Sequence, residues 1–221
     1  MIKKVLIAED HESANLSVQK TLEELGVVDP HYVYYCDDAL LKIQKAKQDK
    51  DPYDLLITDL YFEEGSSKQK LTDGMTLITA ARKAQPELSV LVFSAEKKPA
   101  VIGMLYDKFR IDGFVRKARN DAGELKRAIH LIGQYQRYFP RHLSQLIAKS
   151  RAHQFTKFDI EVLSQMAQGR RQKDIADYLH RQKIKPWGLS SVEKRLKHIR
   201  NVLEFNNNEQ LIAYCKDMGI V

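Results

Sequence analysis

Five polar side chains stand where short apolar runs of this chain come to an end. Glu9 and Asp10 close the run VLIAED, Asp59 follows YDLLIT, Ser94 follows LSVLVF, and Lys117 follows IDGFVR. Each run is short and nearly continuous, which indicates a strand buried on both faces of a parallel sheet. Ligands of such sheets bind beyond the carboxyl ends of the strands, so these side chains should converge on one crevice. Three carboxylates there favour a hard divalent cation such as Mg²⁺, and the site suits phosphoryl chemistry on a carboxylate.

Alternating strand-like and helix-like segments would position those five side chains. Apolar runs predict strands over residues 3–8, 31–35, 54–58, 88–93 and 112–116. Helical spacing of apolar residues predicts helices over residues 12–25, 37–47, 74–84, 98–108 and 121–136. Asp37 or Asp38 is the candidate N-cap of the second helix. Five β/α units in this order predict an α/β fold with a doubly wound, five-stranded parallel sheet.

From residue 155 onward the strand pattern disappears, and four helices are predicted instead. Thr156 is the candidate N-cap of a helix that ends at Gly169, and a second helix covers about residues 171–180. Ser190 or Ser191 is the candidate N-cap of the third helix, and the fourth covers residues 208–217. We therefore expect one domain at residues 1–136, a linker at 137–153 with a short helix from Pro140, and an all-α domain at 154–221.

The net charge of +7 is confined to the last third of the chain. Residues 1–140 carry 21 Lys and Arg against 21 Asp and Glu, whereas residues 141–221 carry 15 against 8. A neutral first domain and a basic second domain indicate that the second faces a polyanion. The alternative is that the basic face of the second domain is only exposed to solvent and has no partner.

The sequence shows no sign of a membrane partner or of an oxidising compartment. No stretch approaches the roughly 20 apolar residues that a membrane span needs. Cys36 and Cys215 lie far apart and without metal-ligand spacing, which favours reduced, buried thiols in a cytoplasmic protein.

Residues 1–136 resemble the receiver domain of two-component response regulators. The resemblance rests on the motifs ED, DL, DG, SA and K, in this order along the five expected strands. It implies that Asp59 is the phosphoacceptor, since a carboxylate can form an aspartyl phosphate. It also implies that Mg²⁺ is held by Glu9, Asp10, Asp59 and the backbone carbonyl of Tyr61.

The same resemblance implies roles for three further residues. Lys117 would contact the phosphoryl group as a positive charge, and Ser94 would donate a hydrogen bond to it. Phe114, three residues before Lys117, stands at the position of the aromatic switch residue. The loop after Asp59 is about seven residues longer than usual and has no proline, which is a departure from the family pattern. This extended DG loop, followed by MTLI, is similar to the capsule-synthesis-regulator branch of the family.

Residues 155–215 resemble the helix-turn-helix domain of the NarL/LuxR family, through FTKFDIEVLSQMAQGRRQKDIADYL and SSVEKRLKHIRNVLEF. The resemblance implies that the third helix enters the major groove of DNA. The chain departs from the family by about six extra residues within RQKIKPWG and by Glu193, where lysine is common. The expected DNA contacts are basic or polar side chains of the second and third helices, namely Lys173, Ser191, Lys194, Arg195, Lys197, His198, Arg200 and Asn201.

Together the two resemblances imply a phosphorylation-controlled transcription regulator and no enzyme beyond slow self-dephosphorylation. A sensor histidine kinase would donate the phosphoryl group to Asp59, and the phosphorylated chain would form a homodimer on double-stranded DNA. RNA polymerase is a candidate further partner. Three alternatives stay open: an output domain that binds a protein instead of DNA, a phosphatase that uses Asp59 as nucleophile, and a regulator that works without phosphate.

Overall fold

A computed structural model of the chain describes residues 2–63, 69–119, 121–140 and 153–221. The chain divides into two compact units, the first holding Met1–Lys97 and Ile102–Pro140 and the second holding Lys98–Val101 and Arg141–Val221. The linker helix expected from Pro140 lies outside the described residues. None of the helices in the described ranges is long and apolar enough to cross a membrane.

The first unit is built on the five-stranded parallel sheet that the sequence predicts. Its strands are β1 (Val5–Ala8), β2 (His31–Val33), β3 (Leu55–Thr58), β4 (Ser89–Ser94) and β5 (Gly113–Arg116). They lie in the order β2-β1-β3-β4-β5, and every neighbouring pair is parallel. The strand order reverses between β1 and β3, so the segments that follow these two strands turn to opposite faces of the sheet and leave room for a ligand at the carboxyl ends.

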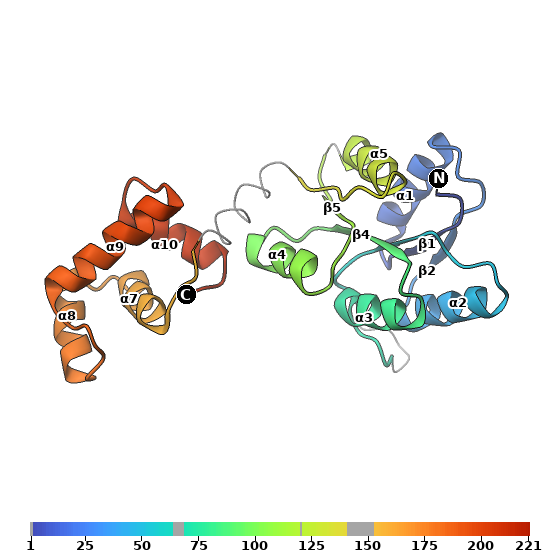
Figure 1. Cartoon of the computed structure of the whole chain (residues 1–221). Helices are drawn as coiled ribbons and strands as arrows, with labels where there is room; N and C mark the ends of the chain where they lie inside the picture. The colour runs from blue at the N-terminus through green and yellow to red at the C-terminus, as the bar shows by residue number, and fades with distance from the viewer. Residues whose placement is uncertain (1, 64–68, 120, 141–152) are drawn as a thin grey trace. The chain divides into compact units, whose positions relative to one another are not determined.

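Helices cover both faces of the sheet, which explains the nearly continuous apolar strands. They are α1 (Glu12–Glu24), α2 (Cys36–Gln48), α3 (Gly74–Ala84), α4 (Pro99–Asp107) and α5 (Asp121–Ile132). Figure 1 shows α1 and α5 together on one side of the sheet and α2 and α3 on the other. Alternate residues of a strand point to opposite faces, so both faces of a doubly covered strand must be apolar.

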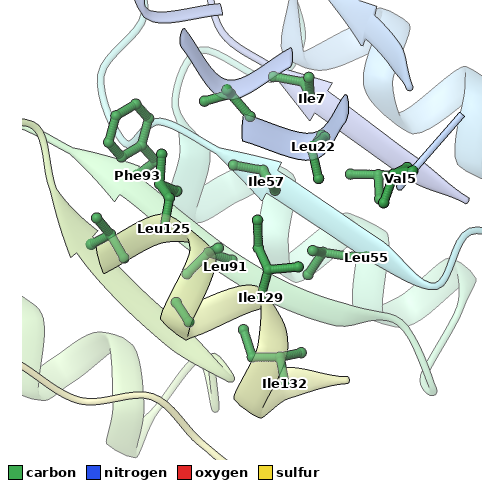
Figure 2. Packing of buried hydrophobic residues seen from close by; sticks show 14 of the residues in the cluster. Val5, Ile7, Leu22, Leu55, Ile57, Leu91, Phe93, Leu125, Ile129 and Ile132 are labelled. Carbon is green, nitrogen blue, oxygen red and sulfur yellow. The ribbon is translucent and has the colours of Figure 1, made fainter. Parts of the chain in front are cut away.

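The two faces of β1 illustrate this packing. Val5 and Ile7 join the core under α1 and α5, where Leu22 and Ile129 also pack (Figure 2). Leu6 and its neighbours on the opposite face join a second core under α2 and α3. The strand ends are thereby fixed by two apolar layers, and the side chains beyond them are held in a defined place.

Two details of the first unit differ from expectation. The helix α2 begins at Cys36 with Tyr35 as N-cap, so the prediction of Asp37 or Asp38 as N-cap is wrong. Both aspartates lie in the first turn, where their charge favours the helix dipole. Tyr138 follows α5 and falls in the predicted linker, yet it is buried in the first core and pairs with Gly113 of β5.

The second unit is all-helical, as predicted, with α7 (Lys157–Ala167), α8 (Gln172–Arg181), α9 (Leu189–Leu203) and α10 (Asn208–Asp217). Thr156 is confirmed as the N-cap of α7, in a capping box with Asp159. The prediction of Ser190 or Ser191 as N-cap of α9 is wrong, because α9 begins earlier, with Gly188 as its N-cap. The apolar stripe of α9 is buried as expected, at Val192, Leu196, Ile199 and Leu203.

Candidate functional site

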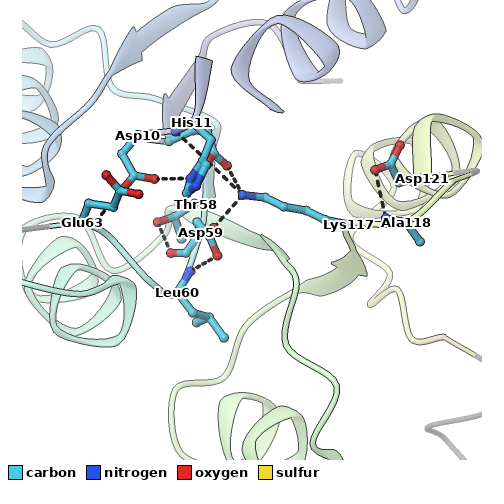
Figure 3. Close-up of polar contacts among 10 residues, drawn as sticks. Asp10, His11, Thr58, Asp59, Leu60, Glu63, Lys117, Ala118 and Asp121 are labelled. Atoms are coloured by element: carbon cyan, nitrogen blue, oxygen red, sulfur yellow. Dashed lines mark hydrogen bonds and ion pairs between the residues drawn. The ribbon is translucent and has the colours of Figure 1, made fainter. Parts of the chain in front are cut away.

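The structure brings the predicted carboxylates and lysine together at the carboxyl edge of the sheet. Lys117, directly after β5, places its Nζ 2.6 Å from Asp59 Oδ2 and 2.7 Å from Glu9 Oε2 (Figure 3). Glu9 and Asp59 are almost fully buried, at 2% and 5% exposure. A lysine shared by two buried carboxylates is a strong electrostatic arrangement, because little water screens it.

For both Glu9 and Lys117, burial and the shared ion pair shift the pKa in opposite directions. Burial raises the pKa of Glu9, although its hydrogen bond and charge interaction with Lys117 oppose the shift. Burial would lower the pKa of Lys117, but the hydrogen bonds to Asp59 and Glu9 outweigh it and raise the pKa instead. Lys117 therefore stays a cation at neutral pH, directly beside Asp59, the candidate nucleophile.

An acidic cluster that could bind a metal surrounds Asp59. One ligand atom each from Glu9, Asp10, His11 and Asp59 lies within 4.8 Å of the others. The three carboxylates come from the ends of β1 and β3, as predicted. His11 was not predicted; its Nδ1 lies 2.8 Å from Asp10 Oδ1, and this contact raises the pKa of the imidazole. The position directly after the acidic pair was the only sequence signal for it.

Ser94 and Phe114 are both fully buried on neighbouring strands. Ser94 is the last residue of β4, and its Oγ has no hydrogen-bond partner among the described residues. Phe114 lies on β5 opposite Val92 of β4. A buried hydroxyl without a partner is costly, which is reason to expect a partner in another state of the protein.

The long loop after Asp59 is closed at its base. Tyr61 forms an antiparallel bridge with Asp73, and the Gly74 N–H donates to the Leu60 carbonyl over 2.9 Å. A Cβ on Gly74 would lie 2.0 Å from the Asp59 carbonyl oxygen, so only glycine fits at this position of the DG motif. The backbone around Asp59 and Tyr61 is therefore held by hydrogen bonds at the base of the loop, although the loop is longer than usual.

Two aspartates hold the described ends of this loop. Asp10 Oδ2 accepts a hydrogen bond from the Glu63 N–H over 2.6 Å, and Asp37 accepts from the Lys70 and Leu71 N–H groups. The tip of the loop, residues 64–68, lies outside the described residues. The Tyr61 hydroxyl donates to the Glu96 carboxylate, which raises the pKa of Tyr61 to about 12.

In the second unit, α9 presents a basic and polar face opposite its buried stripe. Lys194, Lys197, His198 and Asn201 are exposed on it, and Ser191 is half-buried near its start. A hollow of about 590 Å³ opens beside this face and is lined by Thr156, Phe158, Pro186, Ser191, Lys194, Arg195 and His198. The expected contacts on α9 thus share one side of the helix, apart from Arg200, which is half-buried.

Arg195 has a partner within the protein that the sequence reasoning missed. Its Nε and one terminal nitrogen donate to the two oxygens of Asp159 over 2.6 and 2.7 Å. Asp159 is 1% exposed and also accepts from the Thr156 N–H in the capping box. Arg195 therefore ties α9 to the start of α7, whatever contact it makes outside the protein. Lys173, on α8, is exposed.

Comparison with known proteins gives matches along nearly the whole chain. The chain is 26% identical to the transcriptional regulatory protein RcsB of Escherichia coli strain K12, over 98% of this chain and 95% of that protein. A solved structure of two RcsB dimers bound to two parallel DNAs matches with a TM-score of 0.60 at 25% identity, over 98% and 99% of the two chains.

A further structure matches with a TM-score of 0.55 at 27% identity, over 97% and 98% of the two chains. It is RcsB from Salmonella enterica serovar Typhimurium bound to the promoter rprA in the presence of the phosphomimetic BeF₃⁻. No protein-family model matches the chain. The matched proteins extend across both units of the chain described above.

Proposed function

We propose that this chain is a two-component response regulator, a phosphorylation-controlled DNA-binding regulator with a receiver and an output domain, and that Asp59 is its phosphoacceptor. The observation that carries the assignment is the lysine bridge, in which Lys117 Nζ contacts both Asp59 and Glu9 at the carboxyl edge of the sheet. A sensor histidine kinase would be the phosphoryl donor, through a phosphohistidine.

In the transfer step, an oxygen of Asp59 attacks the phosphorus of the phosphohistidine. The new O–P bond forms as the P–N bond breaks, and the imidazole of the donor leaves with the bonding electrons and takes up a proton. Lys117 contributes by placing a fixed positive charge where the phosphoryl oxygens arrive. The chain accepts a phosphoryl group in this scheme and turns over no substrate beyond slow self-dephosphorylation.

Mg²⁺ fits the cluster, because three carboxylates offer the hard oxygen ligands that this ion prefers. Glu9, Asp10, Asp59 and the backbone carbonyl of Tyr61 would hold it. When bound, the ion would neutralise charge between the nucleophile and the dianionic phosphoryl group.

The switch would run through Ser94 and Phe114. The buried Ser94 Oγ lacks a partner among the described residues and is suited to donate a hydrogen bond to a new phosphoryl oxygen. Movement of this hydroxyl would free space that Phe114 can occupy, so phosphorylation would bias a two-state equilibrium of the receiver. The active state would be a homodimer, which gains affinity by spanning two half-sites of duplex DNA.

The output domain would place α9 in the major groove, with Ser191, Lys194, Lys197, His198 and Asn201 as contacts and Lys173 on a phosphate. Arg195 and Arg200 stay predicted contacts, although Arg195 is also engaged by Asp159. RNA polymerase is a candidate partner on DNA, and the site of action would be the cytoplasm. The proposed domains are residues 1–136 and 154–221, with 137–153 as linker.

A protein-binding output domain and a phosphate-independent regulator are the competing proposals. The test is Mg²⁺-dependent modification by acetyl phosphate or beryllofluoride, on wild type and Asp59→Asn, with gel filtration and duplex-DNA titrations on the same samples. Modification of wild type alone, with dimerisation and tighter DNA binding, is the expected result. Unmodified wild type with unchanged DNA binding would overturn the phospho-switch, and absence of DNA binding in both states would favour a protein partner.

A further inference from the structure

The segment that joins α8 to α9, residues 181–188 with Arg181 as the last residue of α8, is longer than in the family that the sequence resembles and carries three cationic side chains. We propose that this segment, here called the basic turn, contacts the phosphate backbone of duplex DNA beside α9. The inference rests on the proposed DNA-binding function of α9 and extends the contact surface beyond that helix.

Two apolar side chains anchor the basic turn to the output domain. Ile184 and Trp187 pack against its apolar core, and the Ile184 N–H donates to the Leu179 carbonyl over 3.0 Å. The Trp187 ring also meets the edge of His180, with centroids 5.2 Å apart. A turn held in place before binding loses little conformational entropy when it contacts a partner.

The charge of the basic turn is of one sign and accessible. Arg181, Lys183 and Lys185 are exposed, and no acidic residue occurs between Asp177 and Glu193 in the sequence. Within the described part of the chain these three cations form no ion pair, and Lys185 instead lies over the Trp187 ring at 5.2 Å.

Two other cations of the same domain are paired with carboxylates. Arg171 pairs with Asp174 over 3.0 Å, and Arg195 pairs with Asp159. Cations without an internal carboxylate partner can replace the counterions of a polyanion. The release of counterions from a nucleic-acid phosphate backbone favours such binding.

The basic turn and the outward face of α9 form one continuous surface. Pro186 of the turn lines the same hollow as Ser191, Lys194 and His198 of α9. Since α9 begins at Leu189, a duplex against its outward face would pass directly beside the turn. Contacts to the DNA backbone position a protein on the duplex without reading sequence, and this is the role that the geometry assigns to Lys183 and Lys185.

The test compares the full-length wild type with Lys183→Gln/Lys185→Gln, both activated by beryllofluoride, in titrations of labelled AT-rich and GC-rich duplexes over a salt series. Each lost phosphate contact should reduce the slope of log K against log salt by about 0.9 and affinity at 0.1 M salt by roughly eightfold. Lys216→Gln, on the exposed side of α10, is the matched control and should behave as wild type. Trp187 fluorescence in urea verifies that each variant is folded.

Equal losses on both duplexes, with a reduced salt slope, are the expected result. A slope and affinity equal to those of wild type and Lys216→Gln would overturn the proposal, as would a loss confined to one duplex, which indicates base reading. If wild type itself binds no duplex, the DNA-binding function fails, and this outcome is distinct from an unchanged slope.

Discussion

Loss of either partner of the ion pair between Asp159 and Arg195 should clearly destabilise the output domain. Asp159 is almost fully buried, and its two oxygens accept from Arg195 over 2.6 and 2.7 Å. Breaking a buried pair by removing one partner costs about 3–5 kcal/mol. Because the Arg195 side chain is 31% exposed, its guanidinium can regain some hydration when Asp159 is replaced, which places that loss just below the lower end of this range.

Three variants separate the contributions. Asp159→Asn keeps an acceptor for the capping box and should cost about 2 kcal/mol, whereas Arg195→Met strands the buried carboxylate and should cost about 3 kcal/mol. The double variant should cost about 3 kcal/mol, clearly less than the two single losses together, because residues in contact are coupled. Arg171→Met is the control, since its pair with Asp174 is exposed and should contribute nothing measurable.

The assay is urea unfolding at pH 7, followed by the fluorescence of Trp187. It is the single tryptophan of the chain and packs against the output-domain core, so it reports this domain selectively. With a denaturant dependence of about 1 kcal/mol/M, the Asp159→Asn midpoint should fall by about 2 M. A midpoint shift no larger than that of Arg171→Met, or strictly additive losses in the double variant, would refute the reasoning.

The pH dependence gives an independent check on the same pair. Burial would raise the pKa of Asp159, but the hydrogen bonds from Arg195 and Thr156 outweigh it and lower the pKa. A carboxyl with a lowered folded pKa contributes stability above its unfolded pKa and loses it as pH falls through the folded pKa. The advantage of wild type over Asp159→Asn should therefore be complete at pH 7 and shrink below about pH 4.

Three further predictions concern the receiver. Gly74→Ala should lower the melting temperature and abolish the beryllofluoride-induced dimer shift in gel filtration, because the new Cβ would lie 2.0 Å from the Asp59 carbonyl oxygen. An unchanged dimer shift would contradict the requirement for glycine at this position. Ser94→Ala should slightly raise the melting temperature of the unmodified protein, because a buried Oγ without a described partner is costly, yet remove the dimer shift on activation. Lys117→Met should bind Mg²⁺ more tightly in calorimetry, because the ammonium group that competes with the ion for Asp59 and Glu9 is gone. The same variant should lose labelling by acetyl phosphate. Weaker Mg²⁺ binding would argue against this competition.

Much of the fold and part of the site could be predicted from the sequence because both are encoded locally. Strand ends are marked by the switch from apolar to polar residues, and parallel strands end at one edge, so Glu9, Asp10, Asp59 and Lys117 had to meet there. The five-stranded parallel sheet is confirmed, as is the Thr156 cap, whose capping box is complete within four residues.

The tertiary structure alone decided which side chains pair across elements. Asp159 and Arg195 are 36 residues apart, and it is the packing of the four helices around one core that brings this guanidinium to that carboxylate. The partnerless Ser94 hydroxyl is likewise a property of its surroundings. Local sequence patterns specify which face of an element is buried, but the partner of a polar group depends on the angle and register at which separate elements pack, and these are set by the whole core.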